Sequence, residues 1–240
     1  MFKINNELFV DLEPFLDLSK ISEYYEQIAY GIAKNCDRIY PTPTSQSSFL
    51  NQELVAHPVV LAEIENKYPE LAYRQSRAMA KFLGSANLGS MLELKRNTVS
   101  YKNKHLSAFT EYTNSANDFK FLFDWIEEQD CFEEYGRVMF FLNEPWQQGV
   151  IHHDYNNSKL NVYKDMFIWI KGPIKKHFFV YDEETDQKHY CPYSASIFNN
   201  NNYHGSENNN WYSSWSLRID GVFKKSWADK VKLSDYFNLI

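Results

Sequence analysis

The stretch Gln148-Gly149-Val150-Ile151-His152-His153-Asp154 decides how the second half of this chain folds. Its last five residues have the length of a strand and follow a turn-like segment that ends at Gly149. Successive side chains of a strand point to opposite faces, so His152 and Asp154 share one face. An imidazole and a carboxylate placed in this way can act as two adjacent ligands of one metal ion. His153 is expected to face outward or to orient a ligand from behind.

Strand-like segments lie on both sides of this stretch. Between Cys131 and Phe223 they alternate with turns rich in Gly, Pro, Asn and Asp, and this pattern predicts an antiparallel sandwich or barrel, with a jelly roll as first choice. A hairpin is expected around 182–186. The predicted strands are residues 137–142, 150–154, 166–170, 177–181, 188–191, 195–199 and 213–223.

Residues 1–117 are expected to form a mainly helical extension that packs on a core of residues 118–227, with residues 228–240 as a tail. The fold class is therefore α+β. Short strands are expected at 8–10 and within 91–101, and a loop at 41–45, where each proline restricts the residue before it. Helices are expected from Leu18, with Ser19 as its cap, at 58–67, at 69–84 and from Asn117.

Composition limits the classes of protein that fit this chain. The 240 residues are 44% hydrophobic and 17% aromatic, which is enough for a sizeable core in one domain. The net charge of −6 argues against nucleic acid as a partner. The apolar runs are too short to span a membrane, and no signal peptide is visible. Three cysteines without CxxC spacing predict reduced thiols and a cytoplasmic location. The oligomeric state has no signature in the sequence.

Two later residues complete the pattern that begins at His152. His204 lies about four strand-length segments after Asp154, the return that a double-stranded β-helix needs to bring a third ligand to the same end. Two imidazoles and one carboxylate on one face of an octahedral ion are the ligand set of non-haem Fe(II) oxygenases. Alternation also places Ser216, Arg218 and Asp220 on one face of the last strand. An arginine inside a barrel needs an anionic partner, and a carboxylate can pair with it through two hydrogen bonds.

Three segments together resemble the 2-oxoglutarate/Fe(II)-dependent oxygenases, and most closely their aspartyl/asparaginyl β-hydroxylase and small prolyl-hydroxylase branch. They are residues 148–154, 196–208 and 216–221, preceded by the helix-to-strand segment 125–137. The resemblance covers about residues 118–223. It implies a double-stranded β-helix in which His152, Asp154 and His204 hold Fe(II).

The same resemblance implies the reaction. 2-Oxoglutarate chelates the iron, its distal carboxylate pairs with Arg218 beside Ser216, and O2 is the second cosubstrate. An unactivated C–H bond is hydroxylated while succinate and CO2 are released, with ascorbate as a reductant. The implied substrate is an amino-acid side chain, either free or in a peptide.

The chain departs from the branch around Arg218. This residue lies farther from His204 than is usual, because residues 207–211 resemble a loop insertion. Asp220 stands where many members carry Ser or Thr. The carboxylate of Asp220 can orient Arg218, or it can compete with the cosubstrate for it.

Three residues are candidates for contact with the substrate: Arg137, Tyr155 and Trp211. Arg137 shares a face with core residues of its strand and can bind a substrate carboxylate, cap the cosubstrate or form an ordinary ion pair. Tyr155 and Trp211 lie close in sequence to expected ligands, in polar surroundings. Core packing is the simpler role for Trp169 and Trp215.

Three other functions fit the same sequence pattern. A cupin-type metalloenzyme would hold the metal without 2-oxoglutarate. A binding module on a jelly roll would carry His152 and Asp154 without any catalytic use. A demethylase-like relative would share the metal site and differ in its substrate loops.

Overall fold

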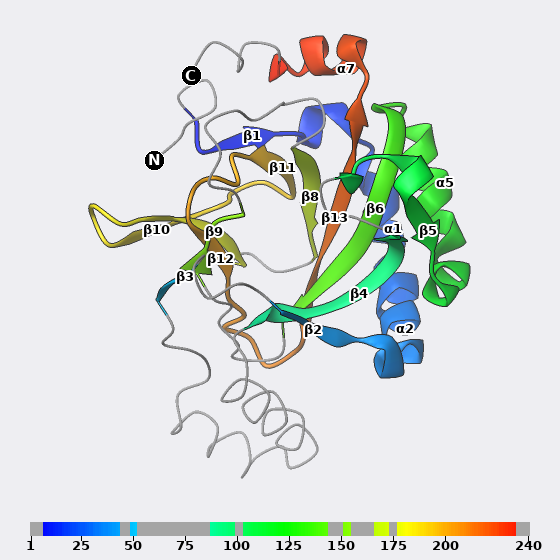
Figure 1. The fold of residues 1–240 in the computed structure, drawn as a ribbon, viewed down its shortest axis with the longest axis horizontal. Coiled ribbons are helices and arrows are strands. Elements are labelled where there is room, and N and C mark those ends of the chain that lie inside the picture. Colours follow the sequence, from blue (N-terminus) through cyan, green and yellow to red (C-terminus); the bar gives the residue numbers. More distant parts are fainter. Residues whose placement is uncertain are drawn as a thin grey trace.

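The computed structural model describes residues 7–43, 49–51, 87–98, 103–143, 151–154, 166–172 and 177–233. In these ranges the chain forms two antiparallel sheets that face each other, with helices on the outer side of the larger sheet (Figure 1). No helix in the described ranges has both the length and the apolar character needed to cross a membrane.

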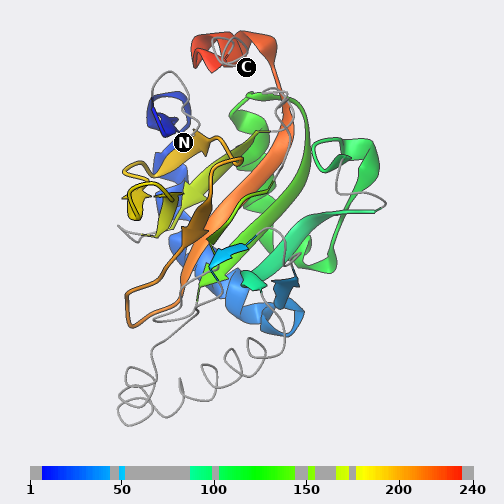
Figure 2. The same cartoon turned by 60° about the vertical axis from the view of Figure 1, so that its left-hand side comes forward.

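The larger sheet holds the long strands. Its order is β1-β11-β8-β13-β6-β4-β2, and β5 pairs with β4. The neighbouring strands β6 and β13 are its long central pair (Figure 2, green and orange). The bounds are β1 (Phe9–Asp11), β2 (Tyr40–Pro43), β4 (Asn87–Asn97), β5 (Thr110–Tyr112), β6 (Phe132–Asn143), β8 (Phe167–Lys171), β11 (Ala195–Phe198) and β13 (Ser214–Phe223).

The smaller sheet has the order β10-β9-β12-β7-β3. Its strands are β3 (Phe49–Asn51), β7 (Ile151–His152), β9 (Phe178–Asp182), β10 (Gln187–Tyr190) and β12 (His204–Ser206). From β6 to β13 the chain passes back and forth between the two sheets, with only the β9–β10 hairpin remaining in one of them. This wrapping is that of a jelly roll, and it confirms the predicted double-stranded β-helix.

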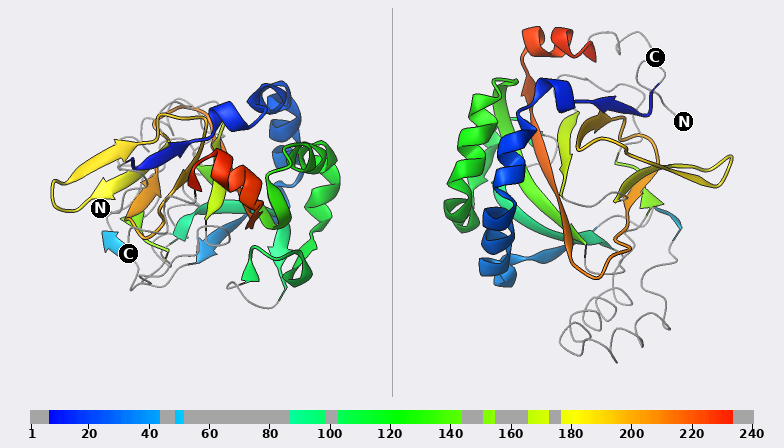
Figure 3. Two further views of the ribbon diagram at one scale, coloured as in Figure 1. Left: turned by 90° about the horizontal axis from the view of Figure 1, so that it is seen from above. Right: turned by 180° about the vertical axis from the view of Figure 1, so that it is seen from behind.

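Helices cover the outer face of the larger sheet. α1 (Leu18–Glu23), α2 (Tyr25–Lys34) and α5 (Lys120–Glu128) lie together on that face, and α7 (Lys225–Lys230) follows β13 (Figure 3). Short 3-10 turns are η1 (Glu13–Phe15), η2 (Cys36–Arg38), η5 (Ser107–Phe109) and η6 (Asn114–Phe119). Phe119, at the end of η6, and Leu122, Phe123 and Ile126 of α5 all belong to the main core.

Several local expectations are wrong. The helix from Leu18 breaks at Tyr24, and Ser19 lies inside α1, where its hydroxyl donates to Asp17 instead of capping the helix. The loop expected at 41–45 begins as strand β2, which tolerates its prolines because it is an edge strand. Helix α5 begins after η6 and not at Asn117. The helices expected at 58–67 and 69–84 lie outside the described residues.

The first 117 residues contribute strands to both sheets. β1, β2, β4 and β5 extend the larger sheet and β3 extends the smaller one, so strand pairing runs across the expected boundary at residue 118. At the other end, α7 spans Lys225–Lys230 and crosses the expected start of the tail.

Two apolar layers result from this arrangement. The main core lies between the helices and the larger sheet, where Ile28, Trp125 and Leu217 are buried. A second, aromatic cluster includes Phe167, Trp169, Phe178 and Phe198, contributed by both sheets. These four aromatic residues line the cavity that also contains the polar residues described below.

Gly136 allows two distant segments to meet beside the second layer. A Cβ atom at Gly136 would lie 2.0 Å from the carbonyl oxygen of Lys104, and the adjacent N–H of Arg137 donates to that same oxygen at 2.7 Å. The close approach brings Lys104 and Arg137 to the same part of the sheet.

Replacement of Gly136 by alanine is therefore expected to destabilise the fold. Backbone atoms must move to admit the methyl group, and overpacking of this kind costs about 1–3 kcal/mol or more. The free energy of unfolding in urea measures the effect. An unchanged value for Gly136→Ala would contradict the close approach of Lys104.

His177 links β9 to the segment between β12 and β13. Its Nδ1 lies 3.3 Å from both the carbonyl oxygen of Glu207 and the hydroxyl of Ser214, and its own carbonyl accepts the N–H of Glu207 at 2.7 Å. Burial lowers the pKa of His177 to about 4. The imidazole is therefore neutral in the folded protein at pH 6.

This pKa predicts a loss of stability on acidification. Because an unfolded histidine titrates near pH 6.5, the unfolded chain binds more protons between about pH 6.5 and pH 4. The contribution of the neutral His177 ring to the free energy of unfolding is complete above about pH 6.5. It is lost as the pH falls from about 6.5 to 4, and the free energy of unfolding then decreases by up to about 1.4 kcal/mol per pH unit. Urea unfolding of His177→Gln is expected to show a flatter pH dependence than the wild type, and parallel curves would contradict the assignment.

Candidate metal centre

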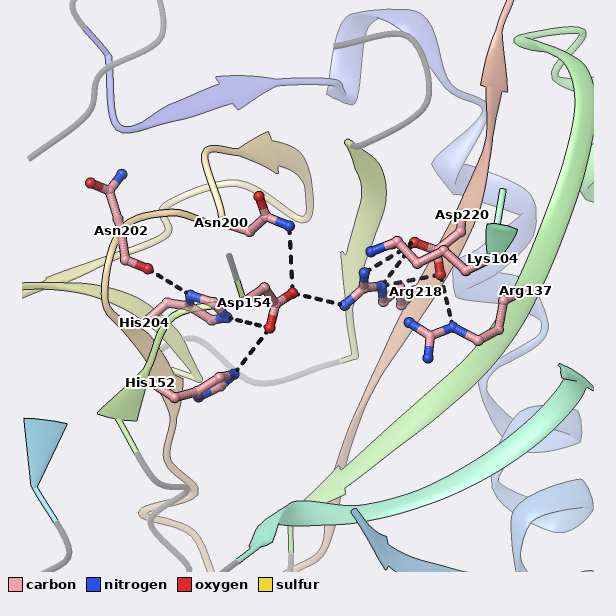
Figure 4. Close-up of polar contacts among 9 residues, drawn as sticks. All are labelled: Lys104, Arg137, His152, Asp154, Asn200, Asn202, His204, Arg218 and Asp220. Carbon is pink, nitrogen blue, oxygen red and sulfur yellow. Dashed lines mark hydrogen bonds and ion pairs between the residues drawn. The ribbon is translucent and has the colours of Figure 1, made fainter. Parts of the chain in front are cut away.

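The pairing of β7 with β12 brings two histidines together. His152 and His204 are direct partners across these strands, with ring centroids 4.3 Å apart. Side chains of directly opposite residues project to the same face of a sheet. Both rings are buried, and they face the larger sheet across the interior (Figure 4).

Asp154 completes the cluster. The backbone N–H of Asp154 donates to the carbonyl oxygen of Asn200 at 3.0 Å, which fixes the chain just after β7. Asp154 Oδ1 lies 3.5 Å from His152 Nε2 and 3.9 Å from His204 Nε2. One ligand atom from each residue lies within 4.8 Å of the other two, so the three residues form a His-Asp-His triad.

The donor set fits a divalent metal ion. Ligands at adjacent positions of an ion with bonds of about 2.1 Å are separated by about 3 Å. The separations of 3.5 Å and 3.9 Å from Asp154 Oδ1 to the two histidines exceed this by less than about 1 Å. Two imidazoles and one carboxylate suit Fe(II) and leave three coordination positions for other groups.

Hydrogen bonding orients the His204 ring for this role. Its Nδ1 lies 2.8 Å from the carbonyl oxygen of Asn202, which can only accept, so Nδ1 carries the proton. The lone pair is then on Nε2, the atom that faces Asp154. Burial lowers the pKa of His204 to about 3, so the ring is neutral near pH 7, the form that binds a metal.

The two oxygens of Asp154 face different partners. Oδ1 faces the two histidines, whereas Oδ2 lies 3.4 Å from Asn200 Nδ2 and 3.4 Å from Arg218 Nη1. Burial alone would raise the pKa of Asp154. The interactions with His152, His204 and Arg218 outweigh burial and hold that pKa well below its usual range. Asp154 is therefore an anion with one oxygen directed at the metal position.

Asp220 is the second carboxylate that holds Arg218. Arg218 donates to it through Nε at 3.2 Å and through Nη2 at 3.0 Å. Arg137 Nε donates to the same carboxylate at 3.0 Å, and Lys104 Nζ lies 3.7 Å away. Burial opposes ionisation of Asp220, but these three cations lower its pKa to about 2. Both roles open to Asp220 from the sequence, orienting Arg218 and competing with the cosubstrate for it, require this contact.

A cavity of about 80 Å³ adjoins the triad. Arg137, Arg218 and Trp169 line it together with the three triad residues. The guanidinium carbon of Arg218 lies 3.6 Å from the centroid of the Phe167 ring, a cation–π contact that covers one face of the guanidinium. The volume is several times the roughly 15 Å³ that one water molecule needs, so a small organic anion is the class of ligand that matches it.

The remaining candidates differ in position. Arg137 lines the cavity, whereas Ser216 is fully buried, and its hydroxyl has no hydrogen-bond partner among the described residues. Trp211 is 45% exposed in the segment between β12 and β13 and does not line the cavity. Tyr155 lies outside the described residues. His153 packs against the Tyr203 ring and is not part of the cavity wall.

Sequence reasoning missed three residues that support the site: Lys104, Asn200 and Asn202. The two asparagines lie in the run 199–202 just before His204, and their closeness to a proposed ligand was the available signal. Lys104 carries no such signal, because only the close approach at Gly136 brings it to Asp220.

Comparison with known proteins finds likeness only among solved structures. No protein-family model matches the sequence, and no curated protein matches it. An oxidoreductase of the 2OG-Fe(II) oxygenase family from Burkholderia pseudomallei aligns with a TM-score of 0.35 and 12% identity, over 55% of this chain. The alignment spans 64% of that oxidoreductase.

Two hydroxylases align over more of their length. A prolyl-4-hydroxylase from Pseudomonas putida gives a TM-score of 0.31 and 12% identity, over 72% of this chain and 91% of its own. A prolyl hydroxylase from Trichoplax adhaerens, in complex with a hypoxia-inducible-factor peptide, gives 0.32 and 9%, over 88% and 94%. Because these scores are low, the fold assignment rests on the strand order of the chain itself.

The triad predicts a specific pattern of metal binding. The wild type is expected to bind one Mn(II) ion, and His152→Ala, Asp154→Ala and His204→Ala are each expected to lose that binding, because each removes one of three ligands. Titration calorimetry measures this. His153→Ala is the matched control, since its ring lies outside the cluster. Equal binding by His153→Ala and His152→Ala would contradict the ligand assignment.

Proposed function

We propose that this chain is a 2-oxoglutarate- and Fe(II)-dependent dioxygenase that hydroxylates an unactivated C–H bond and releases succinate and CO2. The observation that carries the proposal is the His152-Asp154-His204 triad beside a cavity that Arg218 lines. Two histidines and one carboxylate with open positions are the ligand set of non-haem Fe(II) oxygenases, whereas calcium and magnesium prefer sites made of oxygen ligands.

Different residues of the chain would bind the metal and the cosubstrate. His152, Asp154 and His204 would hold Fe(II), and Arg218, beside Ser216, would pair with the distal carboxylate of 2-oxoglutarate. Bound Fe(II), with 2-oxoglutarate and O2, supplies the oxidising chemistry. Phe167, Trp169 and Phe178 form an apolar wall that limits access of water to the reacting groups.

The proposed substrate is an amino-acid side chain, either free or in a peptide. The support is the sequence resemblance to the aspartyl/asparaginyl and prolyl hydroxylase branch at residues 148–154, 196–208 and 216–221. Tyr155 and Trp211 are proposed to contact it, whereas Arg137, which lines the cavity, is a candidate for either the substrate or the cosubstrate. Ascorbate is proposed as a reductant, and a cytoplasmic location fits three cysteines that are all free.

A metalloenzyme of the cupin type that does not use 2-oxoglutarate is a second candidate. The observation in its favour is that Arg218 already contacts two carboxylates of the chain, Asp154 and Asp220. In such an enzyme Arg218 would orient the metal ligand and would have no role towards a cosubstrate. Metal-dependent oxidation that proceeds without 2-oxoglutarate is the outcome that this alternative requires.

Succinate formation tests the first proposal. Purified protein is expected to convert 2-oxoglutarate slowly to succinate even without its substrate, when Fe(II), O2 and ascorbate are present. Ascorbate then supplies the two electrons that reduce the oxygen atom that no substrate accepts. His152→Ala is expected to reduce this conversion to the level of free Fe(II), because the iron is no longer held. A proton NMR time course of succinate measures both. Succinate formation at the same rate in His152→Ala and the wild type would refute the proposal.

A further inference from the structure

Two arginines from neighbouring strands share one buried carboxylate beside the metal centre. Arg137 belongs to β6, and Arg218 and Asp220 belong to β13. The Nε atoms of both arginines contact the same oxygen, Asp220 Oδ2, at 3.0 Å from Arg137 and 3.2 Å from Arg218. All three side chains are at least nine-tenths buried.

Strand register explains why these side chains meet. Arg218 pairs with Met139, and Arg137 lies two residues before Met139, so both arginines project from the same face of the sheet. The register shifts between Ile219 and Gly221, at the position of Asp220. Figure 4 shows Arg137 and Arg218 extending from their strands towards the metal centre, with Asp220 between them.

The contacts of Arg218 tie it closely to the metal ligand. Nε and Nη2 of Arg218 are directed at Asp220, and Nη1 is directed at Asp154 Oδ2. Arg218 therefore occupies the position next to the ligand shell. A 2-oxo dicarboxylate that binds a metal through its keto end carries its second carboxylate away from that shell, because two methylene groups separate them. Arg137 lies further along the same cavity wall, where it can meet that carboxylate together with Arg218 (Figure 4).

We propose that Arg137 is a second binding residue for the distal carboxylate of the 2-oxo dicarboxylate, with Asp220 as the positioning residue that holds both guanidinium groups side by side. This inference rests on the proposed function and adds a residue to the same site. Arg137 lines the cavity that also holds Arg218 and the triad. Two guanidinium groups on one carboxylate form charge-assisted hydrogen bonds with fixed directions.

The proposal gives a physical reason for an aspartate at position 220. Guanidinium groups of like charge repel each other at close range in a medium of low dielectric constant. A neutral hydroxyl at position 220 could accept a hydrogen bond but would not offset that repulsion. A carboxylate offsets it, and it also meets the ammonium group of Lys104. The ion pairs therefore hold the guanidinium groups of Arg137 and Arg218 in position on the cavity wall before a ligand binds.

Binding of two 2-oxo acids to the Mn(II)-loaded full chain tests the proposal. 2-Oxoglutarate carries the distal carboxylate, and 2-oxopentanoate has the same carbon chain without it. Titration calorimetry gives the ratio of the two affinities. Arg137→Gln is expected to weaken 2-oxoglutarate binding about tenfold or more, because a buried charged contact is lost, and to leave 2-oxopentanoate binding unchanged. Arg96→Gln, which removes an exposed ion pair with Glu111, is the matched control and is expected to keep both affinities.

Two further variants keep the test decisive. Arg137→Lys retains a cation without the forked geometry and is expected to show a smaller loss of the same selective kind. Asp220→Asn is expected to reduce the ratio as well, because both guanidinium groups lose their anchor. A purely structural role of Arg137 would weaken the binding of both ligands together and leave the ratio unchanged, so this outcome counts against the proposal.

An unchanged ratio in Arg137→Gln and Arg137→Lys would overturn the role of Arg137, even if the wild type binds 2-oxoglutarate well. Equal affinities of the wild type for 2-oxoglutarate and 2-oxopentanoate would overturn the proposal that Arg137 and Arg218 bind the distal carboxylate. Failure of the proposed function has a different signature, since the wild type would then not bind 2-oxoglutarate, whether or not it binds Mn(II).

Discussion

The pairing of two short strands, β7 with β12, is the constraint on which the rest of the site depends. It makes His152 and His204 direct cross-strand partners, and the chain leaving β7 turns back at Asp154 to hydrogen-bond with Asn200. Neither strand is longer than three residues, so neither can hold its position alone. β12 is held between β7 and β9, and the His177 contacts fix the segment that follows it. The two-sheet wrapping thus converts residues distant in sequence into one ligand cluster.

A connected set of buried ion pairs is the second feature on which the site depends. Asp154, Arg218, Asp220 and Arg137 form a continuous series of ion pairs in the interior, joined at one point by Lys104. Removing such groups from water is costly unless every charge meets a partner, so each member of the series supports the next. The low pKa of Asp220 shows how strongly its cations favour the charged form. A site built in this way has its electrostatic field and its side-chain directions fixed before any ligand binds.

The sequence predicted the parts that follow from local periodicity, together with one long-range return. Strand alternation placed His152 and Asp154 on one face, and the count of strand segments placed His204 at the same end of the barrel. The missing parts depend on contacts between distant segments. β12 is too short and polar to carry a strand pattern, β2 contains prolines that only its edge position permits, and Lys104 reaches Asp220 only through the space left at Gly136. Arg137 was one candidate with three possible partners until the fold placed Asp220 beside it.

We propose that the triad and the arginine-lined cavity form one binding site for a metal and a 2-oxo dicarboxylate. A crystal structure of the full chain with Mn(II) and the oxalyl-glycine analogue of 2-oxoglutarate tests it most directly. The expected result is a metal bound by His152, Asp154 and His204, with the analogue chelating it and directing its distal carboxylate to the wall formed by Arg218 and Arg137. A metal bound elsewhere, or an analogue whose distal carboxylate points away from both arginines, would contradict it.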